Sequence, residues 1–156
     1  MEVYFSLGSN TGDRRKNLDT ALQLLEEAFG QVRAVSRFIE TEPWGFTAST
    51  PFLNAAARFD VIDPDPYEIL RVCKDIERRM GRTDAVEFDS DGKRVYHSRI
   101  IDIDILFIGT MRIDSPELTV PHPLAAVRDF VKIPLREVVT EEFLSGENSY
   151  VFDINS

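Results

Sequence analysis

Hydrophobic residues change their spacing along this chain in a definite order, and that order restricts the possible folds more than any other feature. Apolar residues at every second position predict strands, because successive strand side chains point to opposite faces. Apolar residues at three- and four-residue steps predict helices. The pattern predicts, in order, a strand at 3–7, a helix at 18–29, strands at 31–40 and 53–61, a helix at 69–80 and a strand at 100–108.

This order predicts an α+β fold with a ferredoxin-like βαββαβ core, in which two helices cover one face of a mainly antiparallel sheet. After Gly109 the chain is expected to turn back through residues 111–113 as a hairpin that extends the sheet. Short helical turns at 124–139 are expected to cover the other face, so that helices lie on both. We interpret residues 1–156 as a single domain.

Composition restricts the possible partners. The chain carries 18 Lys and Arg against 27 Asp and Glu, a net charge of −9, which disfavours a large nucleic-acid interface because a phosphate backbone needs clustered cations. No apolar run approaches the roughly 20 residues of a membrane span. Cys73 is the single cysteine, which excludes an intrachain disulfide and suits a reducing compartment. We therefore expect a cytoplasmic protein with no nucleic-acid or membrane partner.

Residues 82–99 lose the hydrophobic period and are rich in charged and small polar side chains. Loops longer than about 12–15 residues without secondary structure of their own are usually functional lids or disordered segments. We expect a long, mobile catalytic loop here.

Two aspartates interrupt the most apolar strand. Asp102 and Asp104 share one face, and the opposite face is expected to carry Ile101, Ile103, Ile105 and Phe107. Neighbouring carboxylates near an apolar sheet repel each other, so a cation or a shared proton is expected beside them. Mg²⁺ suits this pair because it prefers oxygen ligands and often takes one or two protein carboxylates. The alternative is a solvated strand face that happens to carry two aspartates.

Other residues could complete a nucleotide site. Arg82, Arg99 and Arg128 could bind phosphate oxygens through their planar guanidinium groups. His122 stands between two prolines and could donate a hydrogen bond to a nucleotide, or could be satisfied by backbone groups. Each of these residues could equally be an ordinary surface or loop residue.

A planar ring could bind beside the third strand. Asn54 shares a strand face with Ala56 and Arg58, and its amide could read a heterocycle edge because it offers donors and an acceptor. An aromatic slot could come from Trp44, Phe46, Phe52 and Phe130. No G-x-x-x-x-G-K-[ST], G-x-G-x-x-G or G-x-S-x-G motif occurs in the chain, which weakens the common nucleotide cradles and the serine hydrolases.

Taken together, these residues resemble the 6-hydroxymethyl-7,8-dihydropterin pyrophosphokinase family of folate biosynthesis. The Arg99-x-x-Asp102-x-Asp104 element, followed by Pro121-His122-Pro123, is the most specific part of the match. Further elements at the family's positions are Leu7-Gly8-Ser9-Asn10, Thr41-x-Pro43-x-Gly45, Phe52-Leu53-Asn54-Ala55-Ala56, Ile76-Glu77, Gly81-Arg82, Leu118-Thr119-Val120 and Arg128-x-Phe130.

The resemblance implies transfer of pyrophosphate from ATP to the pterin alcohol, with release of AMP, by an enzyme that is expected to be a monomer. It assigns two Mg²⁺ ions to Asp102 and Asp104, which with Arg82 and Arg99 would be catalytic. The pterin site that it implies consists of Thr41, Pro43, Trp44, Gly45, Phe52, Asn54 and Phe130. The ATP site that it implies consists of Glu77, Arg99, Ile105, Thr119, His122 and Arg128.

Two alternatives remain open at the level of the sequence. A metal-dependent nucleotidyltransferase would also place D-x-D on a strand, although it should carry a basic groove. A catalytically weak pterin- or nucleotide-binding module would keep the aromatic slot and lose the phosphate contacts. The best argument for that module is the stretch 95–98. There, His97 stands at a position at which the family usually has Gly or Ala.

Overall fold

A computed structural model describes residues 1–41, 51–81, 87–88, 94–95 and 100–153. Its elements, in chain order, are β1 (Glu2–Ser9), α1 (Arg14–Phe29), β2 (Ala34–Val35), β3 (Ile39–Thr41), β4 (Phe52–Asp60), α2 (Pro66–Arg79), β5 (Glu87–Phe88), β6 (Arg94–Val95), β7 (Asp102–Ile108), β8 (Ile113–Asp114), β9 (Thr119–Val120), α3 (Asp129–Arg136), α4 (Glu141–Ser145) and the 3₁₀ helix η1 (Glu147–Phe152).

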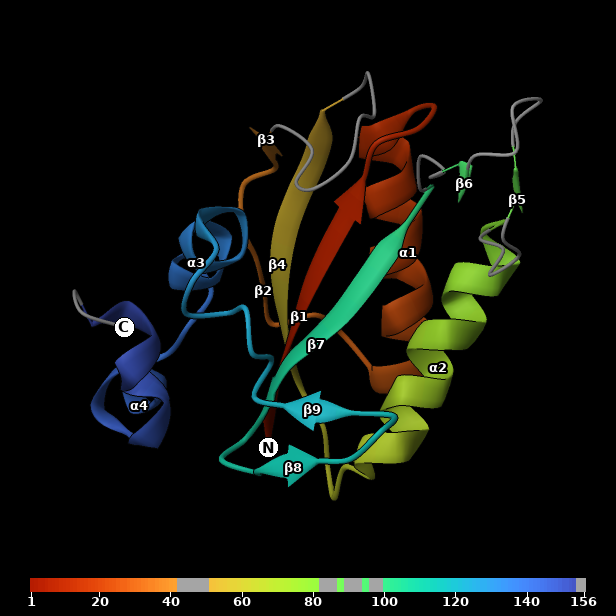
Figure 1. Cartoon of the computed structure of the whole chain (residues 1–156). Helices are drawn as coiled ribbons and strands as arrows, with labels where there is room; N and C mark the ends of the chain where they lie inside the picture. The colour runs from red at the N-terminus through yellow and green to blue at the C-terminus, as the bar shows by residue number, and fades with distance from the viewer. Residues whose placement is uncertain (42–50, 82–86, 89–93, 96–99, 154–156) are drawn as a thin grey trace.

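The main sheet is antiparallel and follows the order β2-β4-β1-β7, with β3 also paired to β4. Helices α1 and α2 lie on one face of this sheet, and α3 and α4 lie on the other side (Figure 1). This arrangement confirms the predicted α+β, ferredoxin-like architecture with helices on both faces. In the described part of the chain, no helix is long and apolar enough to cross a membrane.

The larger core fills the space between the sheet and the first two helices. Val3, Phe5 and Leu7 of β1 are fully buried there, in agreement with the period-two pattern. The two helices begin at Arg14 and Pro66, ahead of the apolar positions predicted at 18–29 and 69–80. The Asp13 and Asp65 side chains cap these starts by accepting hydrogen bonds from backbone N–H groups of the first turn. Both end at glycines with positive φ, Gly30 at +91° and Gly81 at +100°.

A smaller core covers only part of the second face. Tyr4, Phe107 and Phe143 meet there edge to face, with ring centroids 5.0–6.2 Å apart, and Val131 and Leu135 of α3 join them. Tyr4 shares its face of β1 with Ser6 and Gly8, which lie beyond this cluster and line an open cleft. The second face is therefore divided between a packed region and a binding surface.

A bulge in β7 changes one predicted facing. The register with β1 shifts where Tyr4 pairs with Phe107 and Phe5 pairs with Ile105, so that Leu106 is the extra residue. Ile103 and Ile105 face the helices as predicted. Phe107 does not: together with Leu106 it belongs to the smaller core, because the extra residue reverses the alternation.

Three other segments differ from their predicted form. The strand expected at 31–40 is divided into β2 and β3 around Ser36, whose hydroxyl accepts a hydrogen bond from the Ala56 N–H at 2.8 Å. The hairpin expected after Gly109 does not extend the main sheet, since β8 pairs with β9 instead. Within the long loop at 82–99, β5 and β6 pair with each other; the rest of that loop lies outside the described residues.

Candidate active site

The floor of the open cleft is built from two rows of residues that run across three strands. Gly8 of β1 is paired with Asn54 of β4 on one side and with Asp102 of β7 on the other. One step along, Ser6 is paired with Ala56 and Asp104. Paired residues share a face of the sheet, so the topology places the predicted ring-binding amide and the predicted metal-binding carboxylates on one surface.

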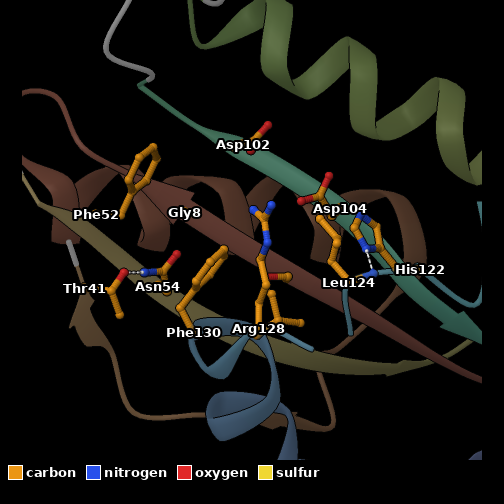
Figure 2. A pocket seen from close by; sticks show the side chains of 12 residues that line it. Gly8, Thr41, Phe52, Asn54, Asp102, Asp104, His122, Leu124, Arg128 and Phe130 are labelled. Atoms are coloured by element: carbon orange, nitrogen blue, oxygen red, sulfur yellow. Dashed lines mark hydrogen bonds between the residues drawn. The ribbon is translucent and has the colours of Figure 1, made fainter. Parts of the chain in front are cut away.

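The amide end of the cleft has the features of a slot for a flat ring. Phe52 of β4 and Phe130 of α3 flank the region in which Asn54 and Thr41 meet (Figure 2). Asn54 is 5% exposed, and its amide nitrogen donates to the Thr41 hydroxyl at 2.6 Å. This bond fixes the amide, so that its carbonyl oxygen is the group presented to a ligand. Orienting a buried amide in this way suits recognition of a heterocycle edge.

Gly8 keeps this slot open. A Cβ atom at this position would lie 3.0 Å from Asn54 Oδ1 and 3.4 Å from a ring carbon of Phe52. The cleft has a volume of about 130 Å³.

The carboxylate end carries Asp102 and Asp104, which project from the same side of β7 (Figure 2). Both are partly exposed, whereas Ile103 between them is buried. The described residues contain no cluster of three or more His, Cys, Asp or Glu side chains able to hold a metal ion. Two oxygen-donating carboxylates on one face still fit Mg²⁺, because this ion commonly takes one or two from the protein and completes its shell with water and phosphate.

A second cleft opens along the free edge of β7, between α2 and β9. Its lining includes Ile105, Thr119 and His122, three of the residues predicted for ATP. Asp104 and His122 line both clefts. The predicted carboxylate site therefore lies where the two clefts meet, which is where a group would be transferred between two bound molecules.

His122 is held in place by two backbone hydrogen bonds. Its backbone N–H donates to the carbonyl of Leu106, the bulge residue, at 2.9 Å. Its ring Nδ1 accepts from the Leu124 backbone N–H at 3.1 Å. A neutral imidazole that accepts at Nδ1 carries its proton on Nε2. Burial lowers the pKa of His122, and the nearby Arg128 guanidinium lowers it further. The negative charge of Asp102 raises this pKa, but by less. The side chain is thus a neutral hydrogen-bond donor near pH 7.

Glu77 of α2 supports the strand that carries the two aspartates. Its side chain is 2% exposed, and Oε2 accepts from the Ile103 N–H on the edge of β7 at 2.9 Å. Lys74 approaches the other carboxylate oxygen at 3.8 Å. Ile103 stands between the two aspartates, so Glu77 anchors the segment of β7 that presents them. Cys73, one turn earlier on α2, is a core residue; burial raises the pKa of its thiol.

The structure brings most of the predicted site residues to these two clefts. The first is lined by Thr41, Phe52, Asn54, Asp102, Asp104, His122, Arg128 and Phe130, and Arg128 lies near the ring of Phe130, with its guanidinium carbon 5.7 Å from the centroid. Predictions for Pro43, Trp44, Gly45, Phe46, Arg82, His97 and Arg99 lie outside the described residues.

Sequence reasoning assigned no site role to several residues that line the clefts: Ser6, Gly8, Leu124 and Val131 in the first, and Leu70, Lys74, Glu117 and Pro123 in the second. Gly8 and Pro123 entered it only as parts of family motifs. Ser6 and Gly8 could have been found, because they share a strand face with each other and with no core residue except Tyr4. The others depend on how loops and helices pack against the sheet.

Comparison with known proteins agrees with this geometry. A sequence model of the family described as 7,8-dihydro-6-hydroxymethylpterin-pyrophosphokinase (HPPK) matches residues 4–140. The chain belongs to this family.

Two curated relatives illustrate the similarity. A 2-amino-4-hydroxy-6-hydroxymethyldihydropteridine pyrophosphokinase of Porphyromonas gingivalis is 48% identical over 139 residues, which cover 87% of this chain and 89% of the relative. The enzyme of the same name from Bacillus subtilis is 36% identical over 149 residues, covering 93% and 84%.

Among solved structures, a triple mutant of HPPK-DHPS from Plasmodium falciparum matches with a TM-score of 0.64 at 18% identity. The alignment covers 97% of this chain and 43% of that one. At this identity the likeness concerns the fold, and it supports the ferredoxin-like assignment.

Proposed function

We propose that this chain transfers pyrophosphate from ATP to 6-hydroxymethyl-7,8-dihydropterin and releases AMP, a step of folate biosynthesis. The family membership and the named relatives support the reaction. The observation in the structure that carries the proposal is the meeting of an aromatic, amide-floored slot and a second cleft at Asp104. Two small molecules bound in these clefts would face each other at the carboxylates.

The slot between Phe52 and Phe130 binds the pterin. Its flat ring stacks between the two aromatic faces, and the Asn54 carbonyl oxygen accepts from the ring's N–H edge. Pro43, Trp44 and Gly45 complete this site in our proposal, as the family resemblance implies. The bound ring then lies over Gly8, with its hydroxymethyl group directed along the sheet toward Asp102.

ATP occupies the second cleft, beside Ile105, Thr119 and the Nε2–H of His122, with Glu77 holding the strand that forms its floor. Arg128 reaches into the first cleft toward the carboxylates (Figure 2) and is placed to neutralise phosphate charge. We propose that Arg82 and Arg99 also neutralise phosphate charge. Asp102 and Asp104 hold two Mg²⁺ ions, which when bound offset phosphate charge and align the reacting oxygens.

In the reaction, the hydroxymethyl oxygen forms a bond to the β-phosphorus of ATP while the bond from that phosphorus to the AMP oxygen breaks, and the hydroxyl proton is released to solvent. Transfers of this kind depend mainly on position and on charge neutralisation. The protein supplies position by holding both substrates on one sheet. The arginines, and the Mg²⁺ ions that Asp102 and Asp104 would hold, supply charge neutralisation.

The test supplies ATP, Mg²⁺ and 6-hydroxymethyl-7,8-dihydropterin and identifies the nucleotide product. We expect AMP, and ADP in its place would refute the proposal. Asp104→Asn should lower kcat by about a thousandfold or more, because metal ions contribute several kcal/mol and each 1.36 kcal/mol is a factor of ten. Asp114→Asn, the same change at an exposed site on β8, is the control and should retain full activity.

Two further measurements separate the alternatives. Binding of the pterin alcohol by calorimetry without turnover would indicate the binding module, and incorporation of a nucleoside monophosphate into nucleic acid would indicate the nucleotidyltransferase. We further propose that residues 1–156 act as one domain, as a monomer without a nucleic-acid partner and in the cytoplasm. The acidic net charge and the buried, unpaired thiol of Cys73 support these assignments, and light scattering would test the oligomeric state.

A further inference from the structure

Arg14, the first residue of α1, links the two chain segments that lead into and out of residues 42–50. Its Nη1 donates to the Glu40 carboxylate at 2.8 Å and to the Pro51 carbonyl at 2.8 Å. Glu40 precedes Thr41 at the end of β3, and Pro51 precedes Phe52 at the start of β4. A single guanidinium nitrogen therefore links a side chain at the end of one strand to the backbone at the start of the other.

The position of Arg14 is not explained by the stability of its own helix. The first turn of α1 contains Arg14, Arg15 and Lys16 and no acidic residue, although the partial positive charge of a helix N-terminus disfavours cations there. Asp13 caps the helix independently of these side chains. The Arg14 side chain is only 25% exposed, so it is held against the strands and does not extend into solvent.

The two segments that Arg14 links carry three of the residues that form the proposed pterin slot. β3 and β4 are paired as Glu40 with Leu53 and as Thr41 with Phe52. The Thr41 hydroxyl accepts the Asn54 amide at 2.6 Å, and Phe52 forms one wall. Within the described residues, Arg14 is not part of the lining of either cleft, because Leu53, the partner of Glu40, packs on the helix-covered face of the sheet.

We infer that Arg14 is a positioning residue for the pterin half of the site: from behind the sheet it fixes the spacing of the β3 and β4 ends, so that Thr41, Asn54 and Phe52 are held in their binding geometry before the ligand arrives. This inference rests on the proposed function. Prior ordering of a site lowers the free-energy cost of binding. Loss of the link should therefore weaken pterin binding and leave ATP binding and the chemical step unchanged.

The experiment compares steady-state kinetics of Arg14→Gln, Arg14→Lys and Lys16→Gln with the wild type, using ATP, Mg²⁺ and 6-hydroxymethyl-7,8-dihydropterin. The Pro51 bond is partly buried, whereas the Glu40 carboxylate is 56% exposed and its attraction is screened by solvent, so Arg14→Gln should raise the KM for the pterin several-fold. The KM for ATP and kcat should stay within about twofold. Arg14→Lys should recover part of the loss, and Lys16→Gln, which removes the same charge from the same turn at an exposed site, should match the wild type.

Calorimetric Kd values for the pterin alone and melting temperatures complete the comparison. If Arg14→Gln is too unstable to measure, Glu40→Gln, which weakens only one arm of the link, should raise the pterin Kd by a smaller factor. An unchanged pterin KM, or an equal rise in both KM values, would overturn the role assigned to Arg14. Absence of any transfer by the wild type would instead overturn the proposed function.

Discussion

At the residue scale, Gly8 contributes to the site by lacking a side chain. It stands between Asn54 and the Asp102 position in one cross-strand row, and a ligand that reaches from the slot to the carboxylates must pass over it. The conformation of Gly8 is that of an ordinary strand, since its φ is not among the positive values in the chain. Space, and not backbone conformation, is what glycine provides here.

Replacing Gly8 by alanine should therefore weaken pterin binding. The added Cβ would lie 3.0 Å from Asn54 Oδ1, which must shift by a few tenths of an ångström and lose its alignment with the ring. We expect the Kd for the pterin to rise about tenfold, corresponding to one displaced hydrogen bond of about 1.4 kcal/mol. Calorimetry would measure this. Asp114→Asn, which lies on β8 outside the lining of both clefts, is the control; equal affinities for wild type and Gly8→Ala would contradict the prediction.

The lowered pKa of His122 leads to a second prediction at this scale. Burial and the Arg128 charge favour the neutral imidazole in the folded protein. The pKa of His122 in the folded protein is thus below its unfolded value of about 6.5. The contribution of His122 to the stability of the fold is therefore fully present above about pH 6.5 and is lost as pH falls through the folded pKa.

Titration of His122 by NMR, without nucleotide or Mg²⁺, should give a pKa below about 6.5. Arg128→Met should raise it, since it removes the repelling charge. Arg136→Met is the matched control, because that guanidinium lies over Phe152, 4.9 Å from the ring centroid. A lower His122 pKa in Arg128→Met than in the wild type would contradict the predicted repulsion between the Arg128 charge and the protonated imidazole.

At the scale of secondary-structure elements, β7 depends on contacts at its free edge. Among the described residues it pairs with β1 on one side only. On the other side, Glu77 from α2 accepts from the Ile103 N–H, and the Leu106 carbonyl accepts from the His122 backbone N–H. These contacts join a helix, the strand and the segment after β9 into one unit around the carboxylates.

Glu77→Ala should destabilise the protein by about 1–3 kcal/mol, the cost of leaving a buried N–H without its acceptor. It should also lower activity, because the Asp102 to Asp104 segment loses its anchor. Glu77→Gln keeps an acceptor oxygen at nearly the same place and should retain more of both. Urea unfolding with parallel assays would measure the two effects. Equal stability of Glu77→Ala and the wild type would show that the edge does not need this acceptor.

At the scale of the whole molecule, the acidic net charge of −9 makes binding of a polyanionic nucleotide dependent on cations. Ligands that bind only the folded state stabilise it in proportion to RT ln(1 + [L]/Kd), about 2.7 kcal/mol at one hundred times Kd. A domain of this size should then melt several degrees higher.

We therefore expect a non-hydrolysable ATP analogue to raise the melting temperature by several degrees with Mg²⁺ and by little without it. The Asp102→Asn, Asp104→Asn double variant should lose the Mg²⁺-dependent part, while the shift caused by the pterin alone should persist. Differential scanning calorimetry would measure both shifts. A full nucleotide shift in the presence of a chelator would exclude the carboxylates from nucleotide binding.

Much of the architecture follows from local rules that the sequence states directly. Alternation at 53–61 predicts β4, and Asp65 followed by Pro66 predicts the start of α2. The strand faces of Asn54 and of the two aspartates follow from the period of two. Where one residue breaks a period, the prediction fails: the bulge at Leu106 reverses Phe107, and Ser36 divides the strand expected at 31–40.

The sequence by itself determined the order of the main elements, the strand faces of Asn54 and of the two aspartates, and the family, because each depends on neighbouring residues or on a motif. Only the tertiary structure decided that Asn54, Gly8 and Asp102 lie in one row, that two clefts meet at Asp104, and that Arg14 reaches the ends of two strands. These arrangements depend on strand register and side-chain packing between segments far apart in the chain, and no local period specifies such distances.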